Sequence, residues 1–467
     1  MPVDDARLRQ DFIPLSEEAK PPPFKEYCAR LPRITLPDVR GATVSAAHLL
    51  GRMSAAPNGT AVNLDDLSVI LAQCAGLKRK SARTGEYFRA VSSAGNRHPY
   101  ELYVCALAIN GLADGVWHYE PDRHALTLIG PPPADGAATL IVSGVPWRSC
   151  WRYAERGYRH VGWDCGTVAS HALMAASAQG LCARLETAFD DAAVGHLIGA
   201  RGHEEVPMVL VPLGESGPAM TPTEDAAPGD LGRGAEEFPL VTAVHEAGNL
   251  RGAAAVASWR QRSAQEFSAQ EFSAQEYSAR ADPHSRAPGP VPEEAGDEAF
   301  GVLVNMRKSA RRFDGSAEIS QAAVRWIVDI ASAAPPWDAG TLHDLRVVVH
   351  SARGMTAGVY RLLAGGLART GPSSREVTHR TCLHQELGRD AAAVFFMTPS
   401  PGLAVAAEAR AYRAALLAAG FALGRIYVAA TALRLGCSGL TFVDSDLPAT
   451  IGAPAALAVA AIGSRCR

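Results

Sequence analysis

The chain has 467 residues, with 45 Lys and Arg against 48 Asp and Glu, so its formal net charge is −3. This length accommodates about two to four domains, and the near-neutral charge excludes the basic footprint of proteins that bind nucleic acid or anionic membranes through charge. The nine Cys form no CxxC pair, which argues against a zinc site or a disulfide framework and predicts a cytoplasmic protein. Arg425 interrupts the longest apolar run, so we expect no segment that spans a membrane. Together these features predict that the protein has no metal, membrane or nucleic acid among its ligands and partners.

Helical and strand patterns alternate along the chain and predict a mixed α+β protein. In chain order, strands are expected at 101–109, 207–212, 345–350, 392–398 and 455–462, and helices at 64–75, 166–181, 321–334 and 412–435. The last helix is rich in Ala and Gly and apolar on all sides. We therefore expect it to lie centrally, covered in part by the other half of the chain.

The two ends of the chain resemble each other at three landmarks. The first pair is Arg52-Met53-Ser54 and Arg307-Lys308-Ser309, which are 255 residues apart. The second is RGYR at 156–159 and RAYR at 410–413, which are 254 residues apart. The third is Ile198-Gly199 and Ile451-Gly452, which are 253 residues apart. Landmarks in the same order at nearly constant spacing predict a tandem duplication of one domain of about 170–200 residues.

The segment 214–299 differs in composition from both sides, being rich in Pro, Gly, Glu and Ala. It contains the repeat SAQEF-SAQEF-SAQEY at 263–277, whose period of five residues gives its aromatic side chains no common helical face. We expect a flexible, solvated linker, with 241–250 more ordered than the rest. A docking segment for a partner is the alternative. The chain then divides into 1–213, the linker 214–299, and 300–467.

One candidate site is RKSARRF at 307–313, where Arg307, Ser309 and Arg311 alternate. In an extended segment alternate side chains point to one side. Two guanidiniums flanking a hydroxyl would cradle a phosphate through charge-assisted hydrogen bonds. A solvated basic cluster is the alternative interpretation.

Two further candidates lie in the first half. The hydroxyls of Ser92 and Ser93, in a turn before a strand, would face a polar heterocycle, unless the segment is only a loop. Tyr153, in WRYAERGYRH at 151–160, is a candidate proton donor or acceptor whose pKa Arg152 would lower. The alternative is that Tyr153 is a packing residue.

Taken together, these motifs resemble those of the nitroreductase-like flavin enzymes, as do GVWHYEP at 115–121 and LGCSGLTFVD at 435–444. The closest branch is the SagB/ThcOx-type azoline dehydrogenases, and PLSEEAKPPPFKEY at 14–27 is similar to the leader segment of that branch. The resemblance covers 1–213 and 300–467. It implies two tandem nitroreductase-like domains, each a central sheet packed with helices, that form an intrachain pseudo-dimer with FMN at the junction.

The resemblance also implies which residues hold the flavin. The second half would supply Arg307, Ser309 and Arg311 for the phosphate, Gln385 for the flavin edge and Ser438-Gly439 for its ring, while the first half would supply Ser92, Ser93 and the Arg152-Tyr153 pair. We call this combination site one. In the reversed combination, site two, Ala56 replaces the second Arg, Ala406-Ala407 replace the Arg-Tyr pair, and Pro335-Pro336-Trp337 lies near the place of the Ser-Ser turn. We expect one intact site.

The activity implied is the FMN-dependent dehydrogenation of azolines to azoles, such as thiazole, in a ribosomally made peptide natural product. The partners implied are an azoline-containing precursor peptide and a cyclodehydratase, and the protein would act as a monomeric pseudo-dimer or a higher homo-oligomer. Arg152 departs from the Lys usual in that branch, and an Arg is a poor general base. Two alternatives remain: an FMN-dependent NAD(P)H reductase of nitro, quinone or enone compounds, and a flavin-free scaffold that binds a peptide or partner.

Overall fold

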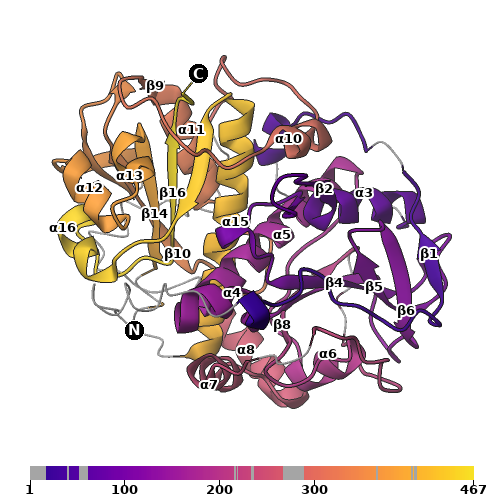
Figure 1. Ribbon diagram of the computed structural model, residues 1–467. Coiled ribbons are helices and arrows are strands. Elements are labelled where there is room, and N and C mark those ends of the chain that lie inside the picture. The colour runs from indigo at the N-terminus through magenta and orange to yellow at the C-terminus, as the bar shows by residue number, and fades with distance from the viewer. Residues whose placement is uncertain are drawn as a thin grey trace.

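The computed structural model describes residues 17–38, 41–51, 61–214, 217, 219–232, 236–266, 289–363, 366–400, 403 and 408–466. These residues form two halves that lie side by side, each built on a six-stranded sheet with helices packed against it (Figure 1). The mixed α+β fold predicted from the sequence is confirmed.

The N-terminal sheet is antiparallel, with the strand order β1-β6-β5-β4-β7-β8. Its strands are β1 (Arg33–Thr35), β4 (Tyr100–Ala106), β5 (Gly115–Glu120), β6 (Ala125–Gly130), β7 (Thr139–Gly144) and β8 (Val206–Pro212), and a separate hairpin comprises β2 (Leu77–Lys80) and β3 (Tyr87–Arg89). The helices are α2 (Ala46–Gly51), α3 (Leu64–Ala75), α4 (Pro146–Tyr153), α5 (Gly157–Ala178) and α6 (Asp191–Leu197).

The C-terminal sheet is also antiparallel, with the order β13-β12-β10-β14-β16-β15. Its strands are β10 (His343–Val349), β12 (Gly358–Leu363), β13 (Gly366–Gly371), β14 (Ala393–Pro399), β15 (Gly436–Leu440) and β16 (Ala458–Gly463), and the short strands β9 (Ile319–Ser320) and β11 (Ala352–Arg353) pair separately. The helices are α10 (Phe300–Met306), α11 (Gln321–Ser332), α12 (Arg375–Thr381), α13 (Glu386–Asp390), α15 (Ala409–Ala432) and α16 (Leu447–Ile451).

The two sheets repeat one topology. The order β6-β5-β4-β7-β8 matches β13-β12-β10-β14-β16. The long helix α5 follows β7 in the chain, and the long helix α15 follows the equivalent strand, β14. Where β15 pairs with β16 in the C-terminal half, the N-terminal half has only an isolated antiparallel bridge between Glu186 and Leu210 of β8. Gly199 and Gly452, the landmark glycines, both follow a short helix with φ values of 61° and 65°. The predicted tandem architecture is therefore confirmed.

Short polar residues fix where several helices begin. The Asn63 side chain accepts a hydrogen bond from the backbone N–H of Asp66 at 2.9 Å and so caps α3. Ser320 caps α11 in the same way, at 2.9 Å from the N–H of Ala323. These caps precede apolar faces that lie buried against the sheets, which is why the sequence pattern predicted both helices.

The long helices α5 and α15 cross at the junction of the two halves (Figure 1). A side chain added at Gly166 would collide with the carbonyl of Leu417, and one added at Gly420 would collide with the backbone of Trp163. These glycines, 254 residues apart in equivalent places, let the two backbones touch. The helix predicted at 166–181 in fact begins at Gly157.

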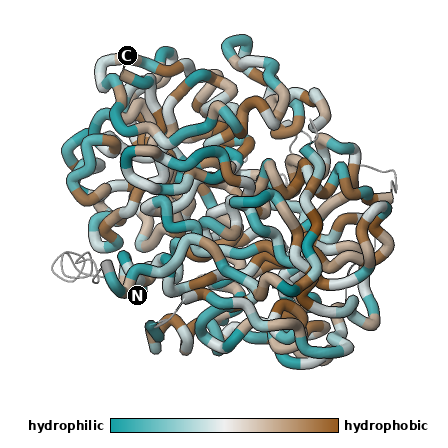
Figure 2. The backbone as a smooth tube through the Cα atoms, turned by 45° about the vertical axis from the view of Figure 1, so that its right-hand side comes forward, coloured by the Kyte–Doolittle hydropathy of each residue, from teal (hydrophilic) through white to brown (hydrophobic). Residues whose placement is uncertain are grey.

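One continuous apolar core spans both halves. Figure 2 shows hydrophobic segments running through the interior and hydrophilic segments on many outer loops. The helix Ala409–Ala432 is long and apolar enough to cross a membrane, but its most apolar stretch is entirely buried inside the protein. Its central position is the one that its all-round apolar sequence predicted.

Part of the linker is packed rather than flexible. Pro239–Ala247 forms α7 and Gly252–Glu266 forms α8. The indole of Trp259 on α8 is fully buried, and Val241 on α7 is 4% exposed. The helix α7 agrees with the expectation that 241–250 is more ordered than the rest of the segment. The expected flexibility does not hold for α8, because the buried Trp259 anchors it. The rest of the repeat, 267–280, lies outside the described residues.

Matching ion pairs join the halves at equivalent places. Asp444 of the C-terminal half binds Arg156 at 2.9 Å and Arg159 at 3.0 Å, and both arginines precede or begin α5. Asp191 of the N-terminal half binds Arg410 and Arg413 of α15, at 2.8 Å and 2.6 Å. The repeated RGYR and RAYR landmarks thus supply cations that cross the junction in both directions.

Candidate active site

The phosphate cradle predicted in the C-terminal half lies against the N-terminal half. Arg307 directly follows α10, and its guanidinium donates through Nε to the carbonyl of Ala90 at 2.9 Å. Lys78 of β2 fixes the same junction by donating to the carbonyls of Val304 and Arg307, each at 2.8 Å. Arg307 is only 8% exposed, and its Nη1 has no partner. Arg307, expected to be a residue of site one, therefore lies at the boundary between the halves.

Tyr427 of α15, which the sequence did not single out, connects the cradle to the β15 residues. Its hydroxyl lies 3.0 Å from the hydroxyl of Ser309 and accepts a hydrogen bond from the N–H of Gly439 at 2.8 Å. The guanidinium carbon of Arg307 lies 5.5 Å from the centre of its ring. The structure thus brings Arg307, Ser309 and Gly439 together, with the largely buried Ser438 beside them.

Two other residues predicted in the C-terminal half lie further out. Arg311 is exposed, two residues beyond the half-buried Ser309. Gln385 precedes α13, and its side-chain amide donates to the carbonyl of Thr441 at 3.5 Å, just after β15. Gln385 therefore stands beside the segment that leaves β15, as its expected role at the flavin edge requires.

The Ser-Ser turn of the N-terminal half is held from two sides. The hydroxyl of Ser93 accepts a hydrogen bond from the N–H of His98 at 2.7 Å, and the N–H of Ala94 donates to Asp164 of α5 at 3.3 Å. Gly95 has a φ of 58°, and a side chain there would collide with the hydroxyl of Tyr153. The turn therefore needs glycine at this position. Ser92 is 8% exposed.

Tyr153 ends α4 and is 8% exposed. Burial raises its pKa, and the nearby Arg152 lowers it by less. Arg152 itself is exposed, with its guanidinium carbon 5.9 Å from the centre of the Tyr153 ring. The prediction that Arg152 favours the phenolate has the right sign, but burial outweighs it, so the phenol stays protonated at neutral pH.

A series of aromatic rings in contact with one another connects Tyr153 to the C-terminal half. Its ring meets that of His160 edge-on at 4.2 Å, and the His160 ring lies 4.6 Å from Trp163. Trp163 in turn stacks with Phe442 of the C-terminal half, at 6.4 Å between ring centres. Tyr153 therefore packs on His160 of α5 and is connected through His160 and Trp163 to the segment that follows β15.

Buried polar atoms without a protein partner collect along this boundary. They are both ring nitrogens of His160, the indole nitrogen of Trp163, Oδ2 of Asp164 and Nη1 of Arg307. An unpaired buried donor or acceptor costs about 1–3 kcal/mol. Other such atoms lie elsewhere in the described residues, but those at the boundary leave donors and acceptors that a polar ligand could satisfy.

The linker helix α8 packs against described residues that correspond to part of the expected site two. The Trp259 indole donates to the hydroxyl of Thr187 at 3.0 Å, and the Ser263 hydroxyl donates to the carbonyl of Asp338 at 2.6 Å. These partners lie beside the bridge between Leu185 and Trp337, the places equivalent to β15 and the Ser-Ser turn. The positions Arg52, Ser54, Ala56 and Ala406-Ala407 lie outside the described residues.

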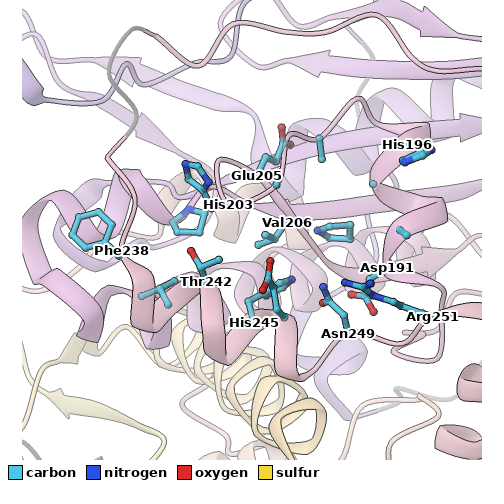
Figure 3. A pocket seen from close by; sticks show the side chains of 18 of the residues that line it. Asp191, His196, His203, Glu205, Val206, Phe238, Thr242, His245, Asn249 and Arg251 are labelled. Atoms are coloured by element: carbon cyan, nitrogen blue, oxygen red, sulfur yellow. The ribbon is translucent and has the colours of Figure 1, made fainter.

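A separate pocket of about 230 Å³ lies between α6, α7 and the start of β8 (Figure 3). Its lining includes His203, Glu205 and His245, and none of the predicted site residues. The carboxylate of Glu205 is paired at 2.6 Å with Lys25, a residue of the segment that resembles a leader. This pocket is therefore distinct from site one.

Comparison with known proteins agrees with this architecture. Residues 304–457 match the Nitroreductase family. This match lies within the C-terminal half. The whole chain superimposes on the crystal structure of an Anabaena variabilis protein named as a nitroreductase, with a TM-score of 0.72 and 22% identity, covering 100% of this chain and 98% of that one. Both halves therefore share the nitroreductase-like fold.

Two relatives match over part of the chain. A protein of Methanocaldococcus jannaschii named as a nitroreductase is 27% identical over 196 residues, 39% of this chain and 95% of its own length. The trifolitoxin-processing protein TfxB of Rhizobium leguminosarum is 32% identical over 196 residues, 36% of this chain. The second match spans 52% of TfxB, about half of that protein.

Proposed function

We propose that the protein is an FMN-dependent oxidoreductase that dehydrogenates azolines to azoles in a ribosomally made peptide, as a SagB/ThcOx-type enzyme. The observation that carries the proposal is the convergence of groups from both halves at one boundary. Arg307 and Ser309 come from one half, and the Ser93 turn and Tyr153 come from the other.

The residues at site one fit the chemistry of FMN. Arg307 has an unpaired buried Nη1, and Arg311 and the Ser309 hydroxyl lie on the same short segment, so together they offer charge-assisted bonds to a phosphate. Ser92, Ser93, Gln385, Ser438 and Gly439 would face the ring system. A bound flavin supplies a two-electron acceptor, which the amino acid side chains lack.

The protein's own task in this reaction is to position the heterocycle and move a proton. Conversion of a thiazoline or oxazoline to the aromatic azole removes one hydrogen with its electron pair and the adjacent one as a proton. Tyr153 is the proton-handling group, since it is buried at the junction beside the Gly95 turn. Arg152 moderates the pKa of Tyr153. The similarity to a trifolitoxin-processing protein supports a peptide substrate.

Anaerobic reduction of the bound flavin tests the proposal. Purified protein is expected to be yellow, and a short synthetic peptide carrying a thiazoline should bleach it, while NADPH should not. Bleaching by NADPH alone would instead favour a reductase, the activity in the name of the M. jannaschii relative. A colourless protein that gains no colour with added FMN would favour a scaffold.

A further inference from the structure

Asp164 is a buried carboxyl that the sequence did not single out. It lies on α5 and is 3% exposed, and its Oδ1 accepts a hydrogen bond from the N–H of Ala94. Its Oδ2 is buried without a partner. In the described part of the chain, no Lys or Arg forms an ion pair with this carboxyl. Hydrogen bonds from Ser93 and Ala94 lower the pKa of Asp164 by less than burial raises it. A buried carboxyl without a cationic partner is destabilising, so its presence needs a physical explanation.

The internal duplication shows that the fold itself does not need this carboxyl. His160 and Asp164 lie one turn apart on α5, on the face toward site one, and their equivalents on α15, at an offset of 254 residues, are Ala414 and Ala418. Both alanines are buried, with exposures of 1% and 0%. The same buried position is thus polar only in the copy that borders the intact site.

Asp164 and Tyr153 both contact the turn that contains Ala94 and Gly95. The carboxyl holds Ala94, and the Tyr153 hydroxyl lies against the next residue, Gly95. Because Tyr153 is a neutral phenol, it can take a proton from substrate only if it passes its own proton on. The ionisable groups on which the charge of Asp164 acts are Tyr153, Tyr100 and Cys165, and burial raises the pKa of all three. None of these neighbours is itself a strong proton acceptor in that environment.

We propose that Asp164 is a further catalytic residue of site one, the buried carboxylate that takes the substrate-derived proton by way of Tyr153. This role rests on the proposed function. In the step, a C–H bond of the azoline breaks and its proton moves to the Tyr153 oxygen, while the phenolic proton moves to Oδ2 of Asp164. The hydrogen of the other C–H bond would leave together with its electron pair, and a bound flavin would supply the two-electron acceptor for it. Burial raises the pKa of Asp164 to about 8, so the carboxyl accepts this proton only in its ionised form, whose share grows as the pH rises through about 8, and the rate of bleaching should rise with it.

The test compares Asp164→Asn, Asp164→Glu and the control Ser170→Ala. Asn keeps the shape and the acceptor for Ala94 but cannot take a proton, while Glu restores an ionisable carboxyl. Ser170 is a buried hydroxyl on the same helix that faces Gly424 of α15. Each variant is measured for FMN content, for anaerobic bleaching by the thiazoline peptide, and, without flavin, for the infrared band of a protonated carboxyl.

We expect all variants to bind FMN as the parent does. Asp164→Asn should slow bleaching by roughly 10²–10⁴-fold and lose the infrared band, Asp164→Glu should recover at least about tenfold over Asn, and Ser170→Ala should match the parent. Equal rates for Asn and the parent, or equal losses for Asn and Glu, would overturn the role of Asp164 alone. A parent protein that the peptide never bleaches would overturn the proposed function, while the infrared comparison would still report on the carboxyl.

Discussion

The carboxylate of Asp191 lies 2.8 Å from the guanidinium of Arg410, and this contact joins the N-terminal half to the C-terminal half. Its counterpart, Asp444 with Arg156, runs the other way across the same junction. The junction is therefore built like the interface of a two-fold symmetric dimer, in which each contact occurs twice. Within one chain the two copies are free to diverge, and the two sites that they form are no longer equivalent.

The first prediction concerns the phosphate cradle. Arg311→Ala should weaken FMN binding by about tenfold or more, because it removes a charge-assisted hydrogen bond of about 1.5–3 kcal/mol. The matched control is Arg312→Ala, which removes the same charge from the neighbouring exposed position. Flavin affinity is measured by fluorescence quenching on titration. Equal losses in both variants would show that only general positive charge matters.

The second prediction concerns Tyr153. Tyr153→Phe keeps the ring that packs on His160, so fold and FMN content should be unchanged, while turnover of the thiazoline peptide should fall by roughly 10²–10⁴-fold. Arg152→Lys should retain activity, because a cation remains beside the phenol. Parental turnover by the Phe variant would make Tyr153 a packing residue.

The third prediction follows from the raised pKa of Asp164. The folded protein holds this proton up to about pH 8, whereas the unfolded chain loses it near the ordinary value of 3.8. The contribution of Asp164 to the free energy of unfolding therefore falls as the pH rises from about 4 to about 8. Asp164→Asn should unfold at higher denaturant than the parent at pH 8, and the gain should shrink at pH 4. A gain that does not depend on pH would contradict the burial of an ionisable carboxyl.

The fourth prediction concerns α8. Trp259→Ala should destabilise the protein by about 3–5 kcal/mol, since it empties a fully buried position, yet FMN content should not rise. The exposed Ala257→Ser on the same helix is the control. Denaturant unfolding and released flavin are measured together. A second equivalent of FMN in the Trp259 variant would mean that α8 alone keeps site two closed.

The sequence predicted much of the fold because apolar periodicity and repeated landmarks are local signals. The helix at 64–75 and the offsets of 253–255 residues needed no knowledge of distant contacts. The partners across the junction could not be found in this way. Asp191 and Asp444 are ordinary acids in the sequence, and only folding brings each one next to its arginines. The same holds for Tyr427, which meets Ser309 from 118 residues away.

The linker was misjudged for a related reason. The five-residue repeat dominates the composition of 214–299, while the residue that anchors α8, Trp259, is a single indole just before it. Asp164 was missed because one acid in an otherwise apolar helix has no motif around it. Its significance appears only when the equivalent Ala418 is set beside it.

The ratio of FMN to polypeptide chain tests the central claim most directly. Protein is saturated with FMN, freed of excess cofactor and denatured, and the released flavin is measured against chain concentration. One equivalent per chain is the predicted result, because the residues proposed for site one come from both halves, while Trp259 and Ser263 of α8 bond residues that correspond to part of site two. Two equivalents, or none, would contradict a single flavin site at the junction.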